Sequence, residues 1–303
     1  MSNKLEELKN ENFKLVNQID QADINNDFDL SVSLKKKFYS NKLLMIDLIS
    51  MKDKKHTMSA RELKAKVDGM KKAIRYETGI RELDEHLKGG FEVGSLIQLA
   101  GQSFAGKTTL FLKIIANISK YANAAFFNFE MGDRRIVKRL VSELKEEQQW
   151  DNLLVNSETR DIEDLVMEIT ILANDGIKFF AVDSRMKLKK QGSDAEYQKI
   201  ASMTSMLSEC AIKNDIIILM INQISEEDLK NKRLSFKGSG DQMYDSDMAL
   251  FVLINEDESR ELICTKSRQD ESTFSMTLPN FNNEIKVVET VYEYKESISM
   301  SVL

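Results

Sequence analysis

The chain has 303 residues, of which 42% are hydrophobic and 30% charged, and its formal net charge is -6 at pH 7. This composition can bury a large core, and its acidic balance argues against bulk attraction to a polyanion, so a nucleic-acid site must be a local basic lining. No apolar run approaches the roughly 20 residues of a membrane span, and the charged N-terminus lacks the apolar region of a signal peptide. We therefore expect a soluble, cytoplasmic protein with no membrane partner.

Residues 1–76 predict a helical N-terminal extension. Further helices are expected over residues 34–51 and 60–73, with a charged link over residues 52–57 between them. The first helix repeats at intervals of three and four residues, as in a short coiled coil or docking helix, through Leu5, Leu8, Asn12, Leu15 and Ile19. Such a helix packs on its own domain or pairs with a neighbouring subunit, so the extension is a candidate for oligomerisation or linker helices.

Residues 77–303 change to apolar runs that alternate with helical stretches, the pattern of an α/β domain with a mostly parallel sheet. A terminal hairpin is predicted over residues 274–288, turning around residues 280–283. Cys210 and Cys264 lie in apolar segments and are expected to be reduced core thiols. The other predicted strands span residues 96–100, 124–129, 179–183, 216–222, 248–254 and 262–266.

A phosphate-binding loop stands between the first of these strands and a helical stretch. Its glycines let successive N–H groups face phosphates, Lys107 reaches the β and γ oxygens, and Thr108 ligates Mg²⁺. The order of strand, loop and helix is the required one, so ATP and Mg²⁺ are the predicted cofactors. The nucleotide-binding residues are predicted to be Gly101, Gln102, Ser103, Phe104, Ala105, Gly106, Lys107, Thr108 and Thr109.

Two acidic residues follow apolar strands farther along the chain. Glu130 lies where the second strand emerges toward the phosphate loop, and a carboxylate there can orient the water that attacks the γ-phosphorus. The alternative is a glutamate that only favours the dipole of the next helix. Asp183 closes the third strand at the edge where ligands bind, which predicts a Mg²⁺ ligand rather than a simple turn cap.

The next strand is followed by Gln223, an amide that can sense the γ-phosphate through a hydrogen bond. Basic residues then follow in residues 225–240, and others directly follow Asp183. Two basic loops at one edge of a sheet can line a channel for single-stranded DNA, whereas each alone is typical of a solvated surface. The predicted DNA-binding residues are Arg185, Lys187, Lys189, Lys190, Lys230, Lys232, Arg233 and Lys237.

Lys266 and Arg268 end the sixth strand, two residues apart on an extended segment, so they point the same way. Such a pair can reach the γ-phosphate of a neighbouring subunit as a trans-acting finger. An ordinary surface charge pair is the alternative, and both interpretations remain open at the level of the sequence.

Taken in order, these segments resemble the RecA-like motor domain of DnaB-family replicative helicases. The lead into the phosphate loop (residues 78–94), the segment Phe-Asn-Phe-Glu-Met around Glu130, and residues 238–251 are similar to the family's motifs. The resemblance implies that Glu130 is the catalytic base, Asp183 the Mg²⁺ ligand and Gln223 the sensor. It also implies that Lys266 and Arg268 are the family's Lys-x-Arg finger.

The chain departs from the family pattern at three places, one of which is the loop after Arg268, where the family's Asn-Gly-Pro is missing. Asp183 is followed by Ser184 and Arg185 rather than by Tyr-Leu, which is nearer to RecA and RadA proteins. Residues 1–76 do not resemble the family's primase-binding N-terminal domain, although part of them is a candidate for its linker helix, which docks on the adjacent subunit.

The resemblance implies an ATP-hydrolysing DNA helicase that forms a ring, a hexamer in this family, moves on single-stranded DNA and works with other replication proteins. Two alternatives remain open from the sequence. One is a RecA- or RadA-type protein that binds single-stranded DNA with ATP and does not unwind it. The other is a regulatory ATPase of KaiC type that acts on protein partners.

Overall fold

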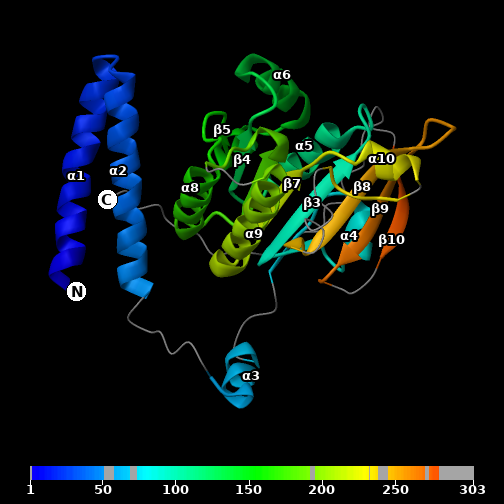
Figure 1. Cartoon of the computed structure of the whole chain (residues 1–303), viewed down its shortest axis with the longest axis horizontal. Helices are drawn as coiled ribbons and strands as arrows, with labels where there is room; N and C mark the ends of the chain where they lie inside the picture. Colours follow the sequence, from blue (N-terminus) through cyan, green and yellow to red (C-terminus); the bar gives the residue numbers. More distant parts are fainter. Residues whose placement is uncertain are drawn as a thin grey trace.

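The computed structural model describes residues 2–50, 58–68, 74–191, 195–231, 233–237, 245–269 and 273–279. A helical hairpin stands beside an α/β body that is built around one large sheet (Figure 1). Among the described residues, no helix is both long enough and apolar enough to cross a lipid bilayer.

The N-terminal hairpin consists of α1 (Ser2–Ile24) and α2 (Phe28–Ser50). The predicted apolar repeat faces the seam between them, where Leu8 and Leu15 are each only 3% exposed. The polar position of that repeat, Asn12, is also buried and donates to the carbonyl of Phe38 on α2. The predicted docking stripe is therefore used within the chain, which explains why its short heptad pattern ends after α1.

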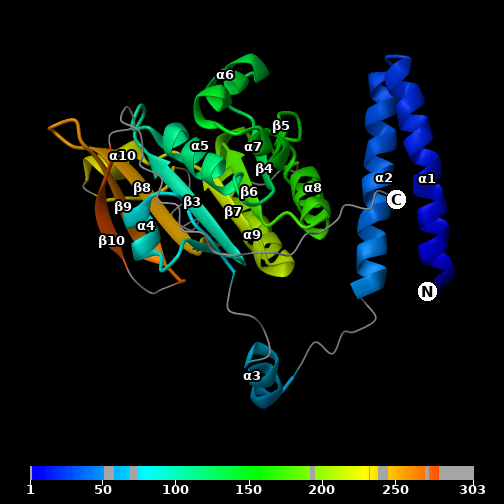
Figure 2. The ribbon, with the colours of Figure 1, turned by 180° about the vertical axis from the view of Figure 1, so that it is seen from behind.

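A separate short helix, α3 (Ala60–Asp68), stands away from both parts of the molecule (Figures 1 and 2). None of its residues is buried. Its start is fixed by Ser59, whose hydroxyl accepts from the Glu62 N–H while the Glu62 carboxylate accepts from the Ser59 N–H, a reciprocal cap. The helices predicted in the extension are confirmed within the described residues. Residues 69–73 of the third predicted helix and the predicted link over residues 52–57 lie outside them.

The main sheet has eight strands in the order β10-β9-β8-β3-β7-β6-β4-β5. The five pairings from β8 through β5 are parallel, and β9 and β10 continue the sheet as antiparallel strands. The strands are β3 (Ser95–Gly101), β4 (Ala124–Asn128), β5 (Leu153–Asn156), β6 (Phe179–Asp183), β7 (Ile217–Ile221), β8 (Met248–Ile254), β9 (Arg260–Ser267) and β10 (Phe274–Leu278). A small antiparallel ribbon, β1 (Arg75–Tyr76) with β2 (Phe91–Glu92), precedes them.

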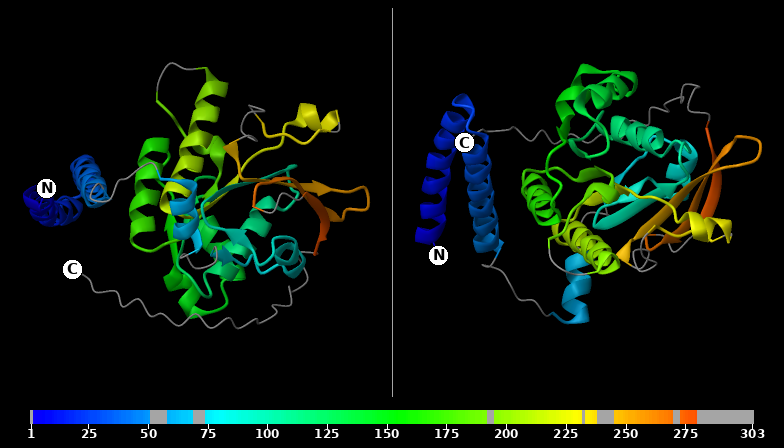
Figure 3. Two further views of the ribbon diagram at one scale, coloured as in Figure 1. Left: turned by 90° about the horizontal axis from the view of Figure 1, so that it is seen from below. Right: turned by 45° about the horizontal axis from the view of Figure 1, so that its top comes forward.

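Helices cover both faces of this sheet, as Figure 3 shows from below. One face packs against α4 (Arg81–His86), α5 (Lys107–Ile118) and α6 (Asp133–Glu143), and the other against α8 (Ile162–Asn174) and α9 (Glu196–Asn214). Strands buried on both faces appear in the sequence as continuous apolar runs, which is why the central ones could be predicted. The remaining helices are α7 (Glu147–Asn152), α10 (Glu226–Lys230) and the 3-10 turn η2 (Arg185–Lys187).

The mostly parallel α/β fold is confirmed, with three differences in detail, the first of which is the ribbon of β1 and β2 that was not predicted. The edge strand β5 was not predicted, because Leu154 and Val155 are exposed and its four residues carry no buried run. The strand over residues 274–278 forms its hairpin with β9, and the predicted turn over residues 280–283 lies outside the described residues. Cys210 and Cys264 are both buried, and neither is in a disulfide, as expected.

Candidate functional site

The phosphate loop leaves the carboxyl end of β3 and leads into α5. Gly101 is required where β8 passes closest, because a Cβ atom there would collide with the carbonyl oxygen of Val252. Phe104 and Gly106 both have positive φ, at 63° and 91°, so the loop curls into a concave row of backbone N–H groups. Such a loop at the N-terminus of a 12-residue helix is an anion-binding site.

Lys107 is the first residue of α5, and its ammonium donates to the carbonyls of Gly101 and Gln102 at 2.9 and 2.7 Å. Burial lowers its pKa, while the charges of Asp183 and Glu130 act in the opposite direction. The cation is therefore held over the loop by groups on three elements. Ala105, Gly106 and Thr109 complete the loop and the first turn of α5, and Phe104 is 95% exposed at its crest.

Asp183 ends β6, two strands from the phosphate loop. It is 2% exposed, and its Oδ2 is buried with no hydrogen-bond partner in the described part of the chain. Burial first, and the Glu130 charge second, raise the pKa of Asp183 to about 7. A buried carboxylate oxygen left without a donor, with the hydroxyl of Thr108 in the same cavity, fits a hard cation such as Mg²⁺.

Glu130 reaches the same cavity from the end of β4. The turn that carries it is held by Asn128, whose amide donates to the Met131 carbonyl and whose oxygen accepts from the Met131 N–H. The Phe129 N–H donates to the Asp183 carbonyl at 2.6 Å, so the ends of β4 and β6 are fixed to each other. The Glu130 carboxylate is exposed and accepts from Ser184 Oγ at 3.4 Å.

One cavity of about 1040 Å³ brings most of the predicted catalytic residues together. Gln223 enters it from the end of β7, and Lys230 and Lys237 enter it from the basic segment that follows. The residues that line it and were predicted from the sequence are Gly101, Gln102, Ser103, Phe104, Lys107, Thr108, Glu130, Asp183, Gln223, Lys230 and Lys237.

The other predicted DNA-binding residues lie in different environments. Lys187, Lys189 and Arg233 are exposed, and Lys190 donates to Ser202 Oγ on α9. Lys232 lies outside the described residues. Arg185 is 2% exposed, so the prediction that it contacts DNA does not fit its position, because its guanidinium is used inside the protein.

Lys266 and Arg268 lie away from this cavity. Arg268 donates its backbone N–H to the carbonyl of Asp247, and Asp247 is bonded in turn to Leu96, near the start of β3. Leu96 is five residues before Gly101, which is about 17 Å at about 3.3 Å per residue. The Arg268 side chain therefore cannot reach the phosphate loop of its own chain.

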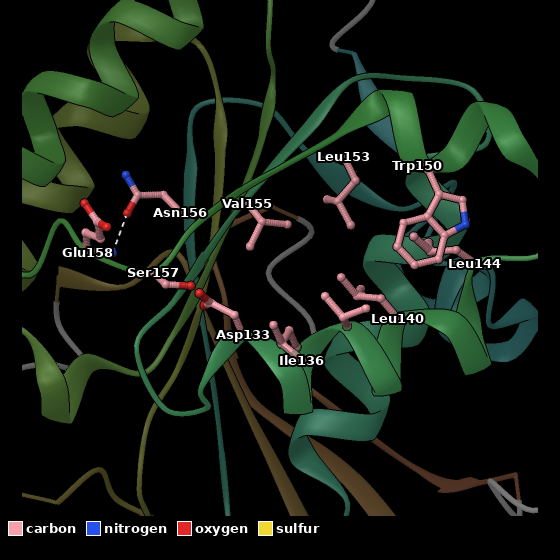
Figure 4. Close-up of a pocket in the computed structure, with 11 residues that line it drawn as sticks. Asp133, Ile136, Leu140, Leu144, Trp150, Leu153, Val155, Asn156, Ser157 and Glu158 are labelled. Atoms are coloured by element: carbon pink, nitrogen blue, oxygen red, sulfur yellow. Dashed lines mark hydrogen bonds between the residues drawn. The ribbon is translucent and has the colours of Figure 1, made fainter. Parts of the chain in front are cut away.

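A second, apolar groove of about 490 Å³ lies beside α6 (Figure 4). Ile136 and Leu140 of α6 face Leu153 and Val155 of β5 across it, and Trp150 closes one end. Asp133 and Ser157 stand at its polar end. Nothing in the sequence pattern predicted this groove, because it forms between a helix and an edge strand that are separate in the chain.

Two residues that the sequence did not predict support the site: they bond to the backbone that positions Glu130 and Gln223. Asn128 fixes the turn of Glu130, and Asn222 accepts from the backbone N–H of Gln223 at 2.8 Å. Each is a buried amide at the end of an apolar strand. That combination, a polar amide where a buried run stops, is the signal that could have identified them.

Two curated relatives are recombination and repair proteins. DNA repair protein RadA of Haemophilus influenzae is 26% identical over 193 residues, which are 60% of this chain and 40% of RadA. DNA repair and recombination protein RadB of Methanococcoides burtonii is 25% identical over 167 residues, covering 52% of this chain and 74% of RadB. The chain thus spans less than half the length of the RadA protein that it matches.

Helicase domains share the same fold. Residues 76–152 match the family model described as DnaB-like helicase C terminal domain. A solved structure described as an ATPase domain has a TM-score of 0.62 at 17% identity and covers 73% of this chain and 95% of its own. A DnaB-like replicative helicase, described with its interactions with primase, has a TM-score of 0.63 at 16% identity, covering 89% of this chain and 73% of that chain. The α/β part of the chain therefore has the RecA-like ATPase fold of these domains, and residues 76–152 are similar to the DnaB-like family model.

Proposed function

We propose that the chain is a subunit of an ATP-driven motor of DnaB type that moves on single-stranded DNA and unwinds duplex during replication. One observation carries the proposal: the phosphate loop, Glu130, Asp183 and Gln223 share a cavity with Lys230 and Lys237. A nucleotide and a polyanion can thus be bound by adjoining residues. A change in the bound nucleotide can therefore alter the binding of the polyanion.

Each cavity residue has a role that follows from its position. The backbone of residues 101–106 and the ammonium of Lys107 bind the phosphates, and Thr108 and Asp183 are placed to hold Mg²⁺. The metal neutralises charge on the phosphate oxygens when it is bound. Glu130 is exposed to the cavity, so it can orient the attacking water and accept its proton. The Gln223 amide is placed to sense the γ-phosphate.

Hydrolysis requires a second copy of the chain in this proposal. Arg268 cannot reach its own phosphate loop, and it is 54% exposed at its side chain, so it is available to the site of a neighbour. Lys266 lies two residues before it, near the end of β9, and both burial and the neighbouring Arg268 charge lower the pKa of Lys266. A cation supplied in trans to the γ-phosphate ties turnover to assembly.

The groove beside α6 gives this assembly a second contact. In helix α3, Leu63 is 50% exposed and Val67 is 55% exposed, and none of the helix's residues is buried. The two side chains lie one turn apart on one face of the helix. An amphipathic helix with such a stripe fits an apolar groove, and α3 of one copy is proposed to lie in the groove of the next. Repetition of a head-to-tail contact closes into a ring, for which six subunits is the proposed number.

The test is ATP hydrolysis by the purified chain with Mg²⁺, with and without a single-stranded oligonucleotide. Stimulation by the oligonucleotide supports the motor, and the absence of hydrolysis under both conditions contradicts it. A forked duplex then separates the two classes of DNA-dependent ATPase. Strand separation supports the helicase, and annealing without separation supports the RadA-type alternative.

The RadA-type alternative is favoured by two observations beyond the shared fold. Both curated relatives act in DNA repair or recombination by name, and the residues after Asp183 depart from the helicase pattern. Under this alternative the nucleotide site is unchanged, and ATP controls binding to single-stranded DNA without unwinding.

A further inference from the structure

Arg185 is a buried cation that the nucleotide site does not use. It starts η2, two residues after Asp183, and it is 2% exposed, whereas Lys187 at the end of the same turn is exposed. Burial lowers the pKa of Arg185 to about 10, so the guanidinium remains charged at neutral pH. Within the part of the chain that the structure describes, no carboxylate lies within ion-pair distance of it, and Glu196 acts on it only at longer range.

The guanidinium joins two segments that follow different strands. Its Nε donates to Oδ1 of Asn222 at 2.9 Å, directly after β7. Its Nη2 donates to the backbone carbonyl of Lys237 at 2.8 Å, in the basic segment that leads toward β8. The two bonds leave in different directions from one planar group, which a lysine ammonium or a glutamine amide cannot reproduce.

The same contacts continue toward the site and across the sheet. Oδ1 of Asn222 also accepts from the N–H of Gln223, and its amide donates to Gln98 in β3. The Lys237 N–H in turn donates to the Gln223 carbonyl at 2.8 Å. Gln223 and Lys237 are therefore held to each other directly, and both are held to Arg185, one directly and one through Asn222.

The energetics argue that this connection has a use beyond packing. A buried charge loses solvation worth several kcal/mol, and an apolar residue of similar size in such a place often gives equal or greater stability. A guanidinium is favoured where two acceptors must be fixed in a set geometry. Here the two acceptors belong to the strand end that carries the sensor amide and to the segment that carries basic side chains.

We propose that Arg185 is a positioning residue that couples the nucleotide edge to the basic segment, so that stimulation of ATP hydrolysis by single-stranded DNA passes through its bonds to Asn222 and the Lys237 carbonyl. The inference rests on the proposed DNA-dependent ATPase and assigns the connection between its two ligands. Arg185 acts through Gln223 and Lys237 and touches neither nucleotide nor DNA.

The experiment compares Arg185→Lys, which keeps the charge and loses the fork, with Arg185→Gln, which loses both. Each is measured as the ratio of hydrolysis rates with saturating oligonucleotide and without it. Both variants are expected to lose about fivefold or more of this ratio, the range of ordinary coupling between two sites. If Arg185→Lys keeps the wild-type ratio, the positioning role is wrong.

The salt dependence of oligonucleotide binding separates a positioning residue from a phosphate contact. Removing one phosphate contact lowers the slope of log K against log salt by about 1. Lys187→Ala, two residues away and exposed, is the matched control, and Lys237→Ala removes a side chain but keeps the carbonyl that Arg185 binds. Arg185→Gln is expected to leave the slope unchanged, and a loss of about 1 would overturn the proposal in favour of a DNA contact.

A measurement on the wild-type chain keeps the proposal testable if the variants unfold. The Lys237 amide should change its hydrogen-exchange protection when a non-hydrolysable ATP analogue binds, because it is bonded to the Gln223 carbonyl. Unchanged protection counts against the connection. If wild-type hydrolysis does not respond to DNA, the proposed function fails together with this inference, whereas a normal response in Arg185→Lys removes the inference alone.

Discussion

The guanidinium of Arg268 lies 3.3 Å from the carboxylate of Asp247, measured from Nη1 to Oδ1. The other oxygen of that carboxylate accepts from the N–H of Leu96 in β3 at 2.9 Å. The proposed finger is thus anchored to the strand whose far end becomes the phosphate loop of the same chain. Because β3 joins the two, the phosphate loop and the finger of one chain cannot move independently. In the proposed assembly, this strand would link one nucleotide site to the next.

Arg268→Ala should abolish turnover while leaving nucleotide binding intact, because the side chain is too far from its own phosphate loop to contact nucleotide there. Lys107→Ala should lose turnover by losing the phosphate contact. Mixing the two inactive variants should restore hydrolysis, because an intact phosphate loop then meets an intact finger. The measurement is steady-state hydrolysis of the mixture against each variant alone. A mixture as inactive as its parts would show that the finger does not act in trans.

Asp247→Asn should lower hydrolysis by about tenfold, equivalent to about 1.4 kcal/mol in the barrier, because the finger loses its charged anchor. Asn can still accept from the Leu96 N–H, so the start of β3 should keep its place. Mixing this variant with Lys107→Ala tests whether Asp247 acts on the finger or on the nucleotide site of its own chain. Recovery assigns Asp247 to the finger, whereas no recovery assigns it to its own nucleotide site through β3.

Asp183→Asn should stabilise the chain in the absence of Mg²⁺ and nucleotide, with a clear pH dependence. Burial, with the Glu130 charge second, raises the pKa of Asp183 from 3.8 to about 7 in the folded state. Between about pH 4 and pH 7 the native protein keeps a proton that the unfolded chain has released, so the wild type loses stability as pH rises through this window. Above about pH 7 the wild type has lost all of this stability, and a further rise in pH changes it no more.

The measurable quantity is the free energy of unfolding of Asp183→Asn minus that of the wild type. It should grow from about pH 4 to pH 7 by at most about 4 kcal/mol, at about 1.4 kcal/mol per pKa unit, and then level off. Denaturant titrations in a chelator at several pH values measure it. A difference that is flat across this range would show that Asp183 titrates normally.

The sequence was sufficient for those features that depend on local pattern. The phosphate loop, Glu130, Asp183 and Gln223 each follow an apolar strand, and parallel strands bring their carboxyl ends to one edge. The environment of Arg185 could not be predicted in this way. Its acceptors lie 37 and 52 residues away in the chain, so the same charge pattern fits both a solvated loop and a buried fork.

The edge strand β5 and the groove beside α6 could not be predicted either, because both depend on contacts between segments that are distant in the chain. Leu154 and Val155 form part of β5 only because β4 offers an open side, and the groove exists only because α6 crosses beside it. The periodicity of α1 was visible, but whether its partner was α2 or another copy depended on the turn at residues 25–27 and on contacts across the seam.

Phe104→Gly should stabilise the folded chain by about 1 kcal/mol. The phenylalanine has φ of 63°, a conformation that costs L-residues about 1–2 kcal/mol and costs glycine almost nothing. The side chain is 95% exposed, so its removal sacrifices no packing within the described chain. Thermal unfolding should shift upward by about 2 °C or more, and ATP affinity should be retained because the backbone N–H groups remain. An unchanged or lower melting temperature would show that the positive φ of Phe104 does not destabilise the folded chain.

Leu63→Ser with Val67→Ser should weaken self-association without changing the stability of the single chain. Both side chains are about half exposed on α3, a helix without a buried residue, so a serine there removes little packing within one copy. In the proposed assembly the exposed half of each side chain is buried in the groove of the next copy, which is worth about 1 kcal/mol per side chain. The matched control is Arg61→Ser with Lys64→Ser, which alters the same helix outside its apolar stripe.

Sedimentation of each double variant over a range of concentrations, with ATP analogue present, measures the effect. The apolar pair should shift the chain toward smaller species and lose hydrolysis in parallel, since the finger then lacks a neighbouring site. The charged pair should assemble as the wild type does. Equal assembly by both pairs would remove α3 from the interface, while leaving the Arg268 contact as the remaining route between subunits.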